Sequence, residues 1–193
     1  MTEIRFDPNN KHLLDSSERR MILPPEKILH DLKVKEGDVF VDVGCGTGYF
    51  AIPAFNMIGS SGRLIALDVS DEMIKELEGR IKENGLDDIE IKHCETYELP
   101  LEDNLASFAF ISNVLHEVED KEKLLKETGR ILDTGGRLGI VEWQKEKTEK
   151  GPPVEIRLSD DEIKGYLEKL GFTLLEEFQE GENFNIFLAQ KKA

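Results

Sequence analysis

The feature that most constrains the fold is an apolar run that ends in closely spaced glycines. The segment 39–48 reads Val-Phe-Val-Asp-Val-Gly-Cys-Gly-Thr-Gly. Its apolar beginning is typical of a strand buried in a parallel sheet. Glycines follow at every second position, and glycine permits the left-handed backbone of a tight turn and a close approach to a ligand. The pattern predicts a buried strand, a ligand-holding turn and a helix.

The remainder of the chain alternates between strand-like and helix-like segments. Helices are expected after Pro24-Pro25, over residues 47–58, and after the N-cap residues Ser70, Asp120 and Ser159. Strands are expected at 39–43, 64–69, 89–94, 107–113, 137–143, 173–178 and 183–189, the last two forming a hairpin. Pro53 should bend its helix, because it would lie past the first turn. This order predicts a doubly wound α/β sheet, mostly parallel, that is closed by an antiparallel C-terminal strand.

Composition limits the classes of protein to which the chain can belong. Its 193 residues suit one domain, and a balance of 34% charged and 39% hydrophobic residues is typical of a soluble globular protein. The formal net charge of −15 disfavours a nucleic-acid partner, because such a field repels phosphate. No apolar stretch approaches the ~20 residues of a membrane helix, and the polar start does not resemble a secretory signal. Cys45 and Cys94 do not form a metal-binding pair, so we expect no metal site. Together with the lack of long apolar stretches, these features lead us to expect no membrane association and a cytoplasmic location.

The spacing of the glycines separates two kinds of nucleotide site. A dinucleotide fingerprint, Gly-x-Gly-x-x-Gly, seats a pyrophosphate on a helix N-terminus. Here its third position is Tyr49, and Asp42 stands two residues before the first glycine. A carboxylate is costly beside a pyrophosphate but tolerable beside a zwitterionic amino acid. Together with Asp68 at the end of the next apolar run, this segment resembles the cofactor loop of class I S-adenosylmethionine-dependent methyltransferases.

The resemblance extends over residues 25–190 and is greatest to small-molecule methyltransferases of the ubiquinone/menaquinone-biosynthesis type. It implies a seven-stranded, Rossmann-like methyltransferase fold, with residues 1–23 as an N-terminal arm or cap and 24–193 as the S-adenosylmethionine-binding domain. The implied cofactor-binding residues are Asp42, Gly44, Cys45, Gly46, Gly48, Asp68, Val69, Glu95, Thr96 and Asn113. Arg19 and Arg20 lie in the arm, which could fold over the cofactor.

Two acidic residues are assigned to the nucleoside part of this cofactor. Asp68 follows the last glycine by about twenty residues, where a carboxylate can accept both ribose hydroxyls; helix capping is its alternative role. Glu95 lies where the family has an adenine-binding acidic residue after the third strand, usually the shorter aspartate, and a solvated loop carboxylate is the alternative. Thr96 or Tyr97 could line the adenine face.

The exit of the fourth strand carries the residues expected to face the methyl group or its acceptor. Residues 108–118 resemble the family's Phe-Asp…Leu-His-His-Val segment, with Ala109 in place of the aspartate and Glu117 in place of the second histidine. Asn113 and His116 are the catalytic candidates, with His116 as a general base toward an oxygen or nitrogen acceptor. A packing role beside the cofactor is the equally weighted alternative for His116. We expect no conspicuous catalytic dyad, because methyl transfer chiefly requires alignment of nucleophile, methyl and sulfur.

The expected function is therefore in-line transfer of a methyl group from S-adenosylmethionine to a small-molecule acceptor. One alternative is a non-catalytic partner or scaffold of the same fold, for which Ala109 leaves room. A less favoured alternative is an NAD-dependent oxidoreductase, whose Tyr-x-x-x-Lys pair this chain lacks. Glu142 and Trp143 end the fifth strand at the same edge, where Trp143 either walls the acceptor pocket or covers the sheet. The sequence indicates neither the acceptor nor the oligomeric state.

Overall fold

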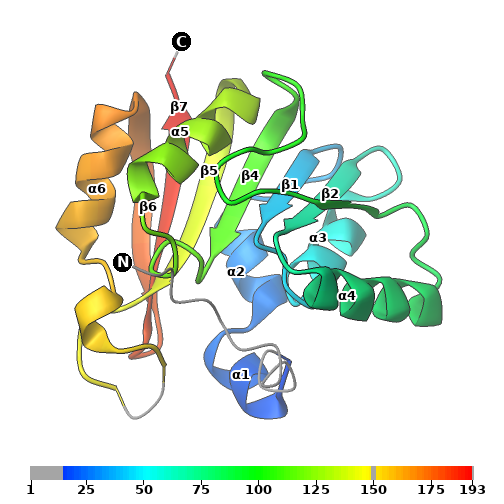
Figure 1. The fold of residues 1–193 in the computed structure, drawn as a ribbon, viewed down its shortest axis with the longest axis horizontal. Coiled ribbons are helices and arrows are strands. Elements are labelled where there is room, and N and C mark those ends of the chain that lie inside the picture. The colour runs from blue at the N-terminus through cyan, green and yellow to red at the C-terminus, as the bar shows by residue number, and fades with distance from the viewer. Residues whose placement is uncertain (1–14, 149–150, 193) are drawn as a thin grey trace.

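A seven-stranded sheet runs through the centre of the molecule in the order β3-β2-β1-β4-β5-β7-β6 (Figure 1). The structure is a computed structural model, and it describes residues 15–148 and 151–192. The strands are β1 (Val39–Val43), β2 (Arg63–Asp68), β3 (Glu90–His93), β4 (Ala106–Ser112), β5 (Leu132–Trp143), β6 (Phe172–Glu180) and β7 (Phe184–Lys191). Strands β1 to β5 pair in parallel, whereas β7 is antiparallel to both β5 and β6. The predicted doubly wound, mostly parallel sheet with an antiparallel C-terminal strand is confirmed.

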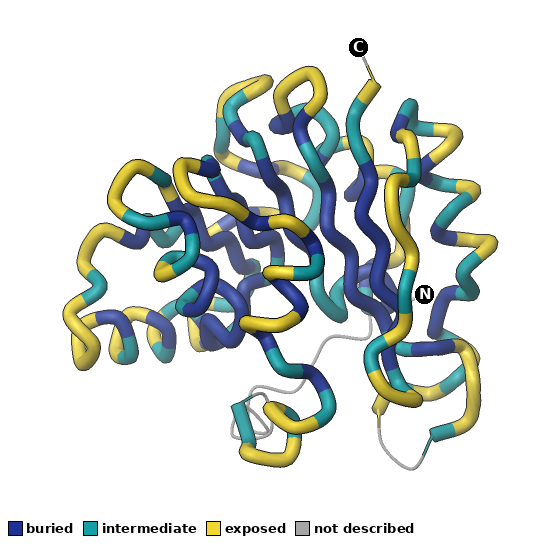
Figure 2. Tube along the Cα trace, turned by 180° about the vertical axis from the view of Figure 1, so that it is seen from behind, coloured by how far each residue is buried: buried dark blue, intermediate teal, exposed yellow. Residues whose placement is uncertain are grey.

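Helices cover both faces of the sheet. They are α1 (Ser17–Ile22), α2 (Pro25–Asp31), α3 (Ala51–Ile58), α4 (Asp71–Asn84), α5 (Lys121–Ile131) and α6 (Asp160–Lys169), with a 3₁₀ turn, η2 (Val154–Ile156). Helices α2, α3 and α4 share a core with Phe40, and α5 and α6 share one with Val41, because neighbouring strand residues point to opposite faces. The strands form the buried centre of the trace in Figure 2. No helix in the described part of the chain has the length and apolar character required to span a bilayer.

Local sequence accounts for most of the helix boundaries. Ser70 and Asp120 cap α4 and α5 with their side chains, and Ser159 forms a capping box at the start of α6, as predicted. Helix α3 differs from the prediction, because it begins at Ala51 after a turn rather than at residue 47. Pro53 therefore lies within the first turn, where a backbone amide has no intrahelical partner to lose. The predicted position of Pro53 past the first turn is accordingly wrong, and the stated reason for a bend does not apply.

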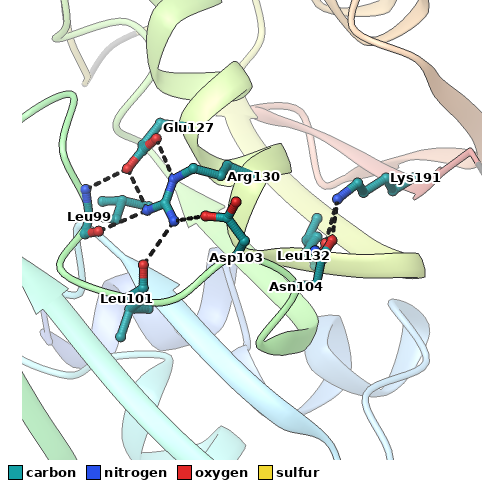
Figure 3. Close-up of polar contacts among 8 residues, drawn as sticks. All are labelled: Leu99, Leu101, Asp103, Asn104, Glu127, Arg130, Leu132 and Lys191. Carbon is teal, nitrogen blue, oxygen red and sulfur yellow. Dashed lines mark hydrogen bonds and ion pairs between the residues drawn. The ribbon is translucent and has the colours of Figure 1, made fainter.

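A polar cluster fixes the loop between β3 and β4 against α5 (Figure 3). The guanidinium of Arg130 donates to the carbonyl groups of Leu99 and Leu101, at 3.0 and 2.8 Å, and pairs with Asp103 at 2.6 Å. Glu127 binds the same guanidinium and accepts from the amide of Leu99 at 2.9 Å. The cluster holds one wall of the cavity described next, because Leu99 contributes to that wall.

Candidate functional site

A cavity of about 720 Å³ opens at the carboxyl ends of the central strands, beside the point where the strand order reverses. Among the predicted site residues, the lining includes Asp42, Gly44, Cys45, Gly46, Asp68, Val69, Glu95, Thr96, Asn113 and His116. Gly48 is not part of the lining, and a Cβ added to it would lie 2.4 Å from Leu77 of α4. Packing against α4 therefore accounts for Gly48, whereas the other predicted residues meet at one place.

The turn after β1 needs glycine for two reasons. Gly44 and Gly46 have left-handed backbone, with φ of +77° and +54°. The amides of Gly44 and Cys45 both donate to the carbonyl of Leu67, at 2.8 and 2.9 Å, which extends the β1–β2 pairing into the turn. A Cβ added to Gly44 would lie 2.4 Å from Cγ2 of Val114, which also lines the cavity. At Gly44 the turn therefore has no room for a side chain.

We expect Gly44→Ala to lower the free energy of unfolding by about 1–3 kcal/mol, because its methyl group overlaps Val114 and left-handed backbone disfavours alanine. Gly79→Ala is the matched control, since Gly79 lies within α4 and nothing lies within 4 Å of its added Cβ. This control should be neutral or stabilising by up to about 1 kcal/mol. Urea denaturation measures both changes. Equal stability of Gly44→Ala and the wild type would show that the turn does not require glycine at this position.

Asp68 is held at the end of β2 by backbone amides. Its Oδ2 accepts from the amide of Gly46 at 2.8 Å, and its Oδ1 accepts from the amide of Ser70 at 2.9 Å. Burial raises the pKa of Asp68, and the amides of Ser70, Gly46 and Val69 oppose part of that rise. A carboxylate has about four acceptor positions, so each oxygen can still accept from a ligand in the cavity. Asp68 thus orients the N-cap residue Ser70 but does not itself cap α4, and its oxygens lie at the position predicted for ribose binding.

Two buried acceptors at the cavity have no hydrogen-bond partner among the described residues. They are Oδ2 of Asp42, in β1, and Oδ1 of Asn113, after the neighbouring strand β4. Asp42 is 2% exposed, and burial together with the charge of Asp68 raises the pKa of its carboxyl group to about 8. Asn113 has left-handed backbone (φ +58°), and its backbone N–H donates to the carbonyl of Val141 at 2.8 Å. These two features fix its position. Because an unpaired buried acceptor costs about 1–3 kcal/mol, the two oxygens fit a bound molecule that brings hydrogen-bond donors.

His116 and Glu142 form a buried pair across the ends of β4 and β5. Nδ1 of His116 lies 2.7 Å from Oε2 of Glu142, whose Oε1 accepts from the amide of Leu115 at 2.8 Å. Burial lowers the pKa of His116, but the charge and hydrogen bond of Glu142, with the charge of Glu117, outweigh burial and the opposing charge of Arg157, so the pKa is raised overall. The fold thus supplies the predicted histidine with a buried carboxylate partner, which sequence analysis did not foresee.

The loop between β5 and α6 forms the outer wall of the cavity. Besides Trp143, its described lining residues are Gly151, Pro152, Pro153 and Ile156. The buried guanidinium of Arg157 donates to the carbonyl groups of Gln144, Glu146 and Pro152 over 2.7–3.0 Å. Its Cζ also lies 5.2 Å from the centroid of the Trp143 ring. Sequence analysis noted Trp143 but missed Arg157, since no local pattern marks an arginine that binds backbone carbonyl groups.

The segment after β3 also reaches the cavity, from a strand that β2, β1 and β4 separate from β5. Glu95 is exposed at the rim, and Thr96 lines the cavity beside it. Tyr97 does not line the cavity; its hydroxyl accepts from the amide of Asp120, the residue that caps α5. Of the two predicted adenine-facing residues, the structure therefore places only Thr96 in the cavity. The described residues contain no group of three or more His, Cys, Asp or Glu side chains placed to hold a metal ion.

A doubly wound sheet with a glycine turn and an aspartate at the end of the next strand defines a Rossmann-like protein that binds a nucleoside cofactor. The chain matches the model of the ubiE/COQ5 methyltransferase family over residues 21–151, and it belongs to this family. It is 33% identical to the demethylmenaquinone methyltransferase of Bacillus subtilis (strain 168) over 117 residues, which are 61% of this chain and 50% of that protein. The chain therefore spans about half the length of the curated relatives it matches.

Solved structures agree with this membership. The crystal structure of a SAM-dependent methyltransferase from Aquifex aeolicus matches with a TM-score of 0.91 and 32% identity, over 96% of this chain and 99% of that one. The [4+2]-cyclase SpnF matches with a TM-score of 0.79 and 18% identity, over 92% of this chain and 83% of that one, which shows the fold alone. The predicted methyltransferase family and Rossmann-like fold are confirmed. Because one fold supports different reactions, the chemistry must be argued from the site.

Proposed function

We propose that this chain binds S-adenosylmethionine in the cavity and transfers its methyl group to a small-molecule acceptor. The observation that carries the proposal is the pair of unpaired acceptors, Asp42 Oδ2 and Asn113 Oδ1, beside the glycine turn. The α-ammonium group of the cofactor brings positively charged donors, which suit a buried carboxylate and an amide oxygen. Family membership supports the same cofactor.

The order of the strands suggests which residues would hold each part of the cofactor. Glu95 and Thr96, after β3, would face the adenine, and Asp68, at the end of β2, would accept from the ribose hydroxyls. The glycine turn and Asp42, on β1, would face the methionyl part. This arrangement leaves the ends of β4 and β5, with His116, for the methyl acceptor.

When bound, the cofactor would supply an electrophilic methyl carbon: a nucleophile in line with the C–S bond would form a bond to that carbon as the C–S bond breaks, and S-adenosylhomocysteine would leave as a neutral thioether. The residues of this chain would orient the acceptor and remove its proton. Glu142 holds the proton of His116 on Nδ1, so the neutral imidazole has its lone pair on Nε2. Nε2 would take the proton of an O–H or N–H group, and Glu142 would stabilise the imidazolium that results. Asn113, fixed at the end of β4, would help to position the cofactor beside the acceptor.

The acceptor side of the cavity is mainly apolar. Its lining includes Val114, Val118, Leu124, Trp143 and Ile156. We propose a small, largely apolar acceptor with an ionisable hydroxyl or amine. The similarity to demethylmenaquinone methyltransferases makes a quinol ring one such compound. The net charge of −15 disfavours a nucleic-acid acceptor, and the buried free thiols of Cys45 and Cys94 suit a reducing, cytoplasmic compartment.

Two measurements test this function. Titration calorimetry with S-adenosylhomocysteine should show binding, whereas NAD(H) should give no heat. Transfer of a tritiated methyl group to a panel of quinols, phenols and amines should show turnover. Sustained turnover would exclude a non-catalytic partner. Heat with NAD(H) alone, or with none of these nucleosides, would overturn the proposal.

Because the pKa of Asp42 is raised, we expect cofactor binding to release a proton from its carboxyl group. The carboxyl group is largely protonated below its raised pKa of about 8, and an ammonium group beside it would lower that pKa. The affinity for S-adenosylhomocysteine should therefore rise with pH toward 8, by at most about tenfold per pH unit. Calorimetry at pH 6.5 in two buffers of different ionisation enthalpy measures the proton release. Asp42→Asn should abolish that release, and an unchanged release in this variant would contradict the assignment.

A further inference from the structure

Arg19 of α1 brings a positive charge to the cavity. It belongs to the lining, and its Cζ lies 4.7 Å from the ring centroid of Tyr49, the residue that follows the glycine turn. Its Nε is buried and has no hydrogen-bond partner among the described residues. Burial lowers the pKa of Arg19, and the neighbouring Tyr49 and Asp15 oppose that change. A buried guanidinium N–H without an acceptor indicates that a bound molecule supplies one.

The other charges around the cavity indicate which group of a ligand could accept a hydrogen bond from Arg19. Asp42, Asp68, Glu95 and Glu117 are all acidic, and Arg19 is the sole arginine or lysine among the described lining residues. An amino acid in this cavity carries a carboxylate as well as an ammonium group. If the ammonium group lies at Asp42, its carboxylate has one permanent cation available within the described lining.

Helix α1 is fastened to the glycine turn, which fixes the place of this guanidinium. The hydroxyl of Tyr49 donates to the carbonyl of Leu23, directly after α1, at 2.7 Å. Asp15, before α1, pairs with Arg80 of α4. Arg80 in turn donates to the carbonyl of Thr47 in the glycine turn at 2.8 Å. These contacts link α1 to the glycine turn at both of its ends.

We propose that Arg19 binds the carboxylate of the amino acid part of the cofactor, so that α1 completes the cofactor site. This inference rests on the proposed function, since it concerns the same bound molecule. A guanidinium presents N–H donors in a planar fork that matches the two oxygens of a carboxylate. The neighbouring Arg20 offers a matched control, because it pairs with Asp15 at 2.7 Å, is not part of the lining, and its side chain is 43% exposed.

Calorimetric titration with S-adenosylhomocysteine tests the assignment without any need for turnover. Arg19→Gln should weaken binding by about 10- to 100-fold, as expected for the loss of a charged hydrogen-bonding partner. Arg19→Lys, which keeps the charge but not the fork, should fall between this variant and the wild type. Arg20→Gln should stay within about twofold of the wild type. Melting temperatures of all four proteins check that each is folded.

A second ligand makes the test specific to the carboxylate. The decarboxylated analogue of S-adenosylhomocysteine keeps the ammonium group, so wild type and Arg19→Gln should bind it equally, because the partner of Arg19 is missing. Unchanged affinity of Arg19→Gln for S-adenosylhomocysteine, or an equal loss for both ligands, would overturn the inference. If the folded wild type bound neither ligand, the proposed function itself would fail, and the inference with it.

Discussion

His116→Gln is expected to lower kcat by about 100- to 10,000-fold, the usual contribution of a general base. Glutamine keeps an amide donor for Glu142, so the buried carboxylate retains a partner, but it has no nitrogen that takes up a proton. The affinity for S-adenosylhomocysteine should stay within about threefold, because His116 acts on the acceptor. Steady-state transfer of tritiated methyl measures kcat, and calorimetry measures the affinity. A kcat equal to that of the wild type would show that His116 only packs beside the cofactor.

The pH profile separates a proton acceptor from a packing residue. His116 must be neutral to act as a base, and its pKa is raised above the ordinary value of 6.5. At saturating S-adenosylmethionine, the kcat/KM of the wild type for the methyl acceptor should therefore increase with pH through that raised pKa and then level off. Burial and the facing groups of Glu142, Glu117 and Arg157 set its position, with the first two carboxylates raising the pKa.

Glu142→Gln should move the rising part of that profile to lower pH, because the largest charge that raises the pKa of His116 is removed. It should also reduce the plateau rate, because the imidazolium loses its counter-ion. His30→Gln is the control, since its side chain is 82% exposed, and it should leave the rate within about twofold. A profile that is identical in Glu142→Gln and the wild type would contradict a positioning role for Glu142.

The parts of the site that could be predicted depend on strand ends, turns and helix caps, each of which lies within one short sequence segment. Asp42 and Gly44 share one strand and its turn, and Asp68 ends the next strand, so their neighbourhood follows from the parallel pairing of β1 and β2. The helix caps were predictable for the same reason, since a cap involves residues a few positions apart. Sequence periodicity also sufficed for the fold class, because alternating strands and helices form few topologies.

The parts that could not be predicted depend on contacts between distant residues. Glu142 meets His116 only because β5 lies beside β4, and the sequence does not indicate which strand-end carboxylate turns toward the histidine. Arg157 holds the loop between β5 and α6 through hydrogen bonds to backbone carbonyl groups. Such bonds have no sequence signature. Helix α3 was predicted too long because the apolar turn before Ala51 looks helical in periodicity alone.

Asp68→Ala is expected to weaken the binding of S-adenosylhomocysteine by at least about 100-fold, because two charge-assisted hydrogen bonds to ribose are lost together. The change also leaves the amides of Gly46 and Ser70 without their acceptor, so the glycine turn loses its link to α4. Asp68→Asn separates the two effects, since it keeps one oxygen for Gly46 but removes the charge.

Calorimetry and melting temperatures of these variants distinguish binding from folding. Asp68→Asn should melt between Asp68→Ala and the wild type, because it keeps an acceptor for only one of the two amides, and it should bind about tenfold more weakly or worse. Asp68→Ala should lose more of both stability and affinity. Asp71→Ala is the control for a general loss of negative charge, since Asp71 is exposed at the start of α4. This variant should bind S-adenosylhomocysteine as the wild type does. If Asp68→Ala were folded and bound S-adenosylhomocysteine as the wild type does, the ribose would not lie at β2. The proposed orientation of the cofactor would then fail, because it places the ribose between the adenine at β3 and the methionyl part at β1.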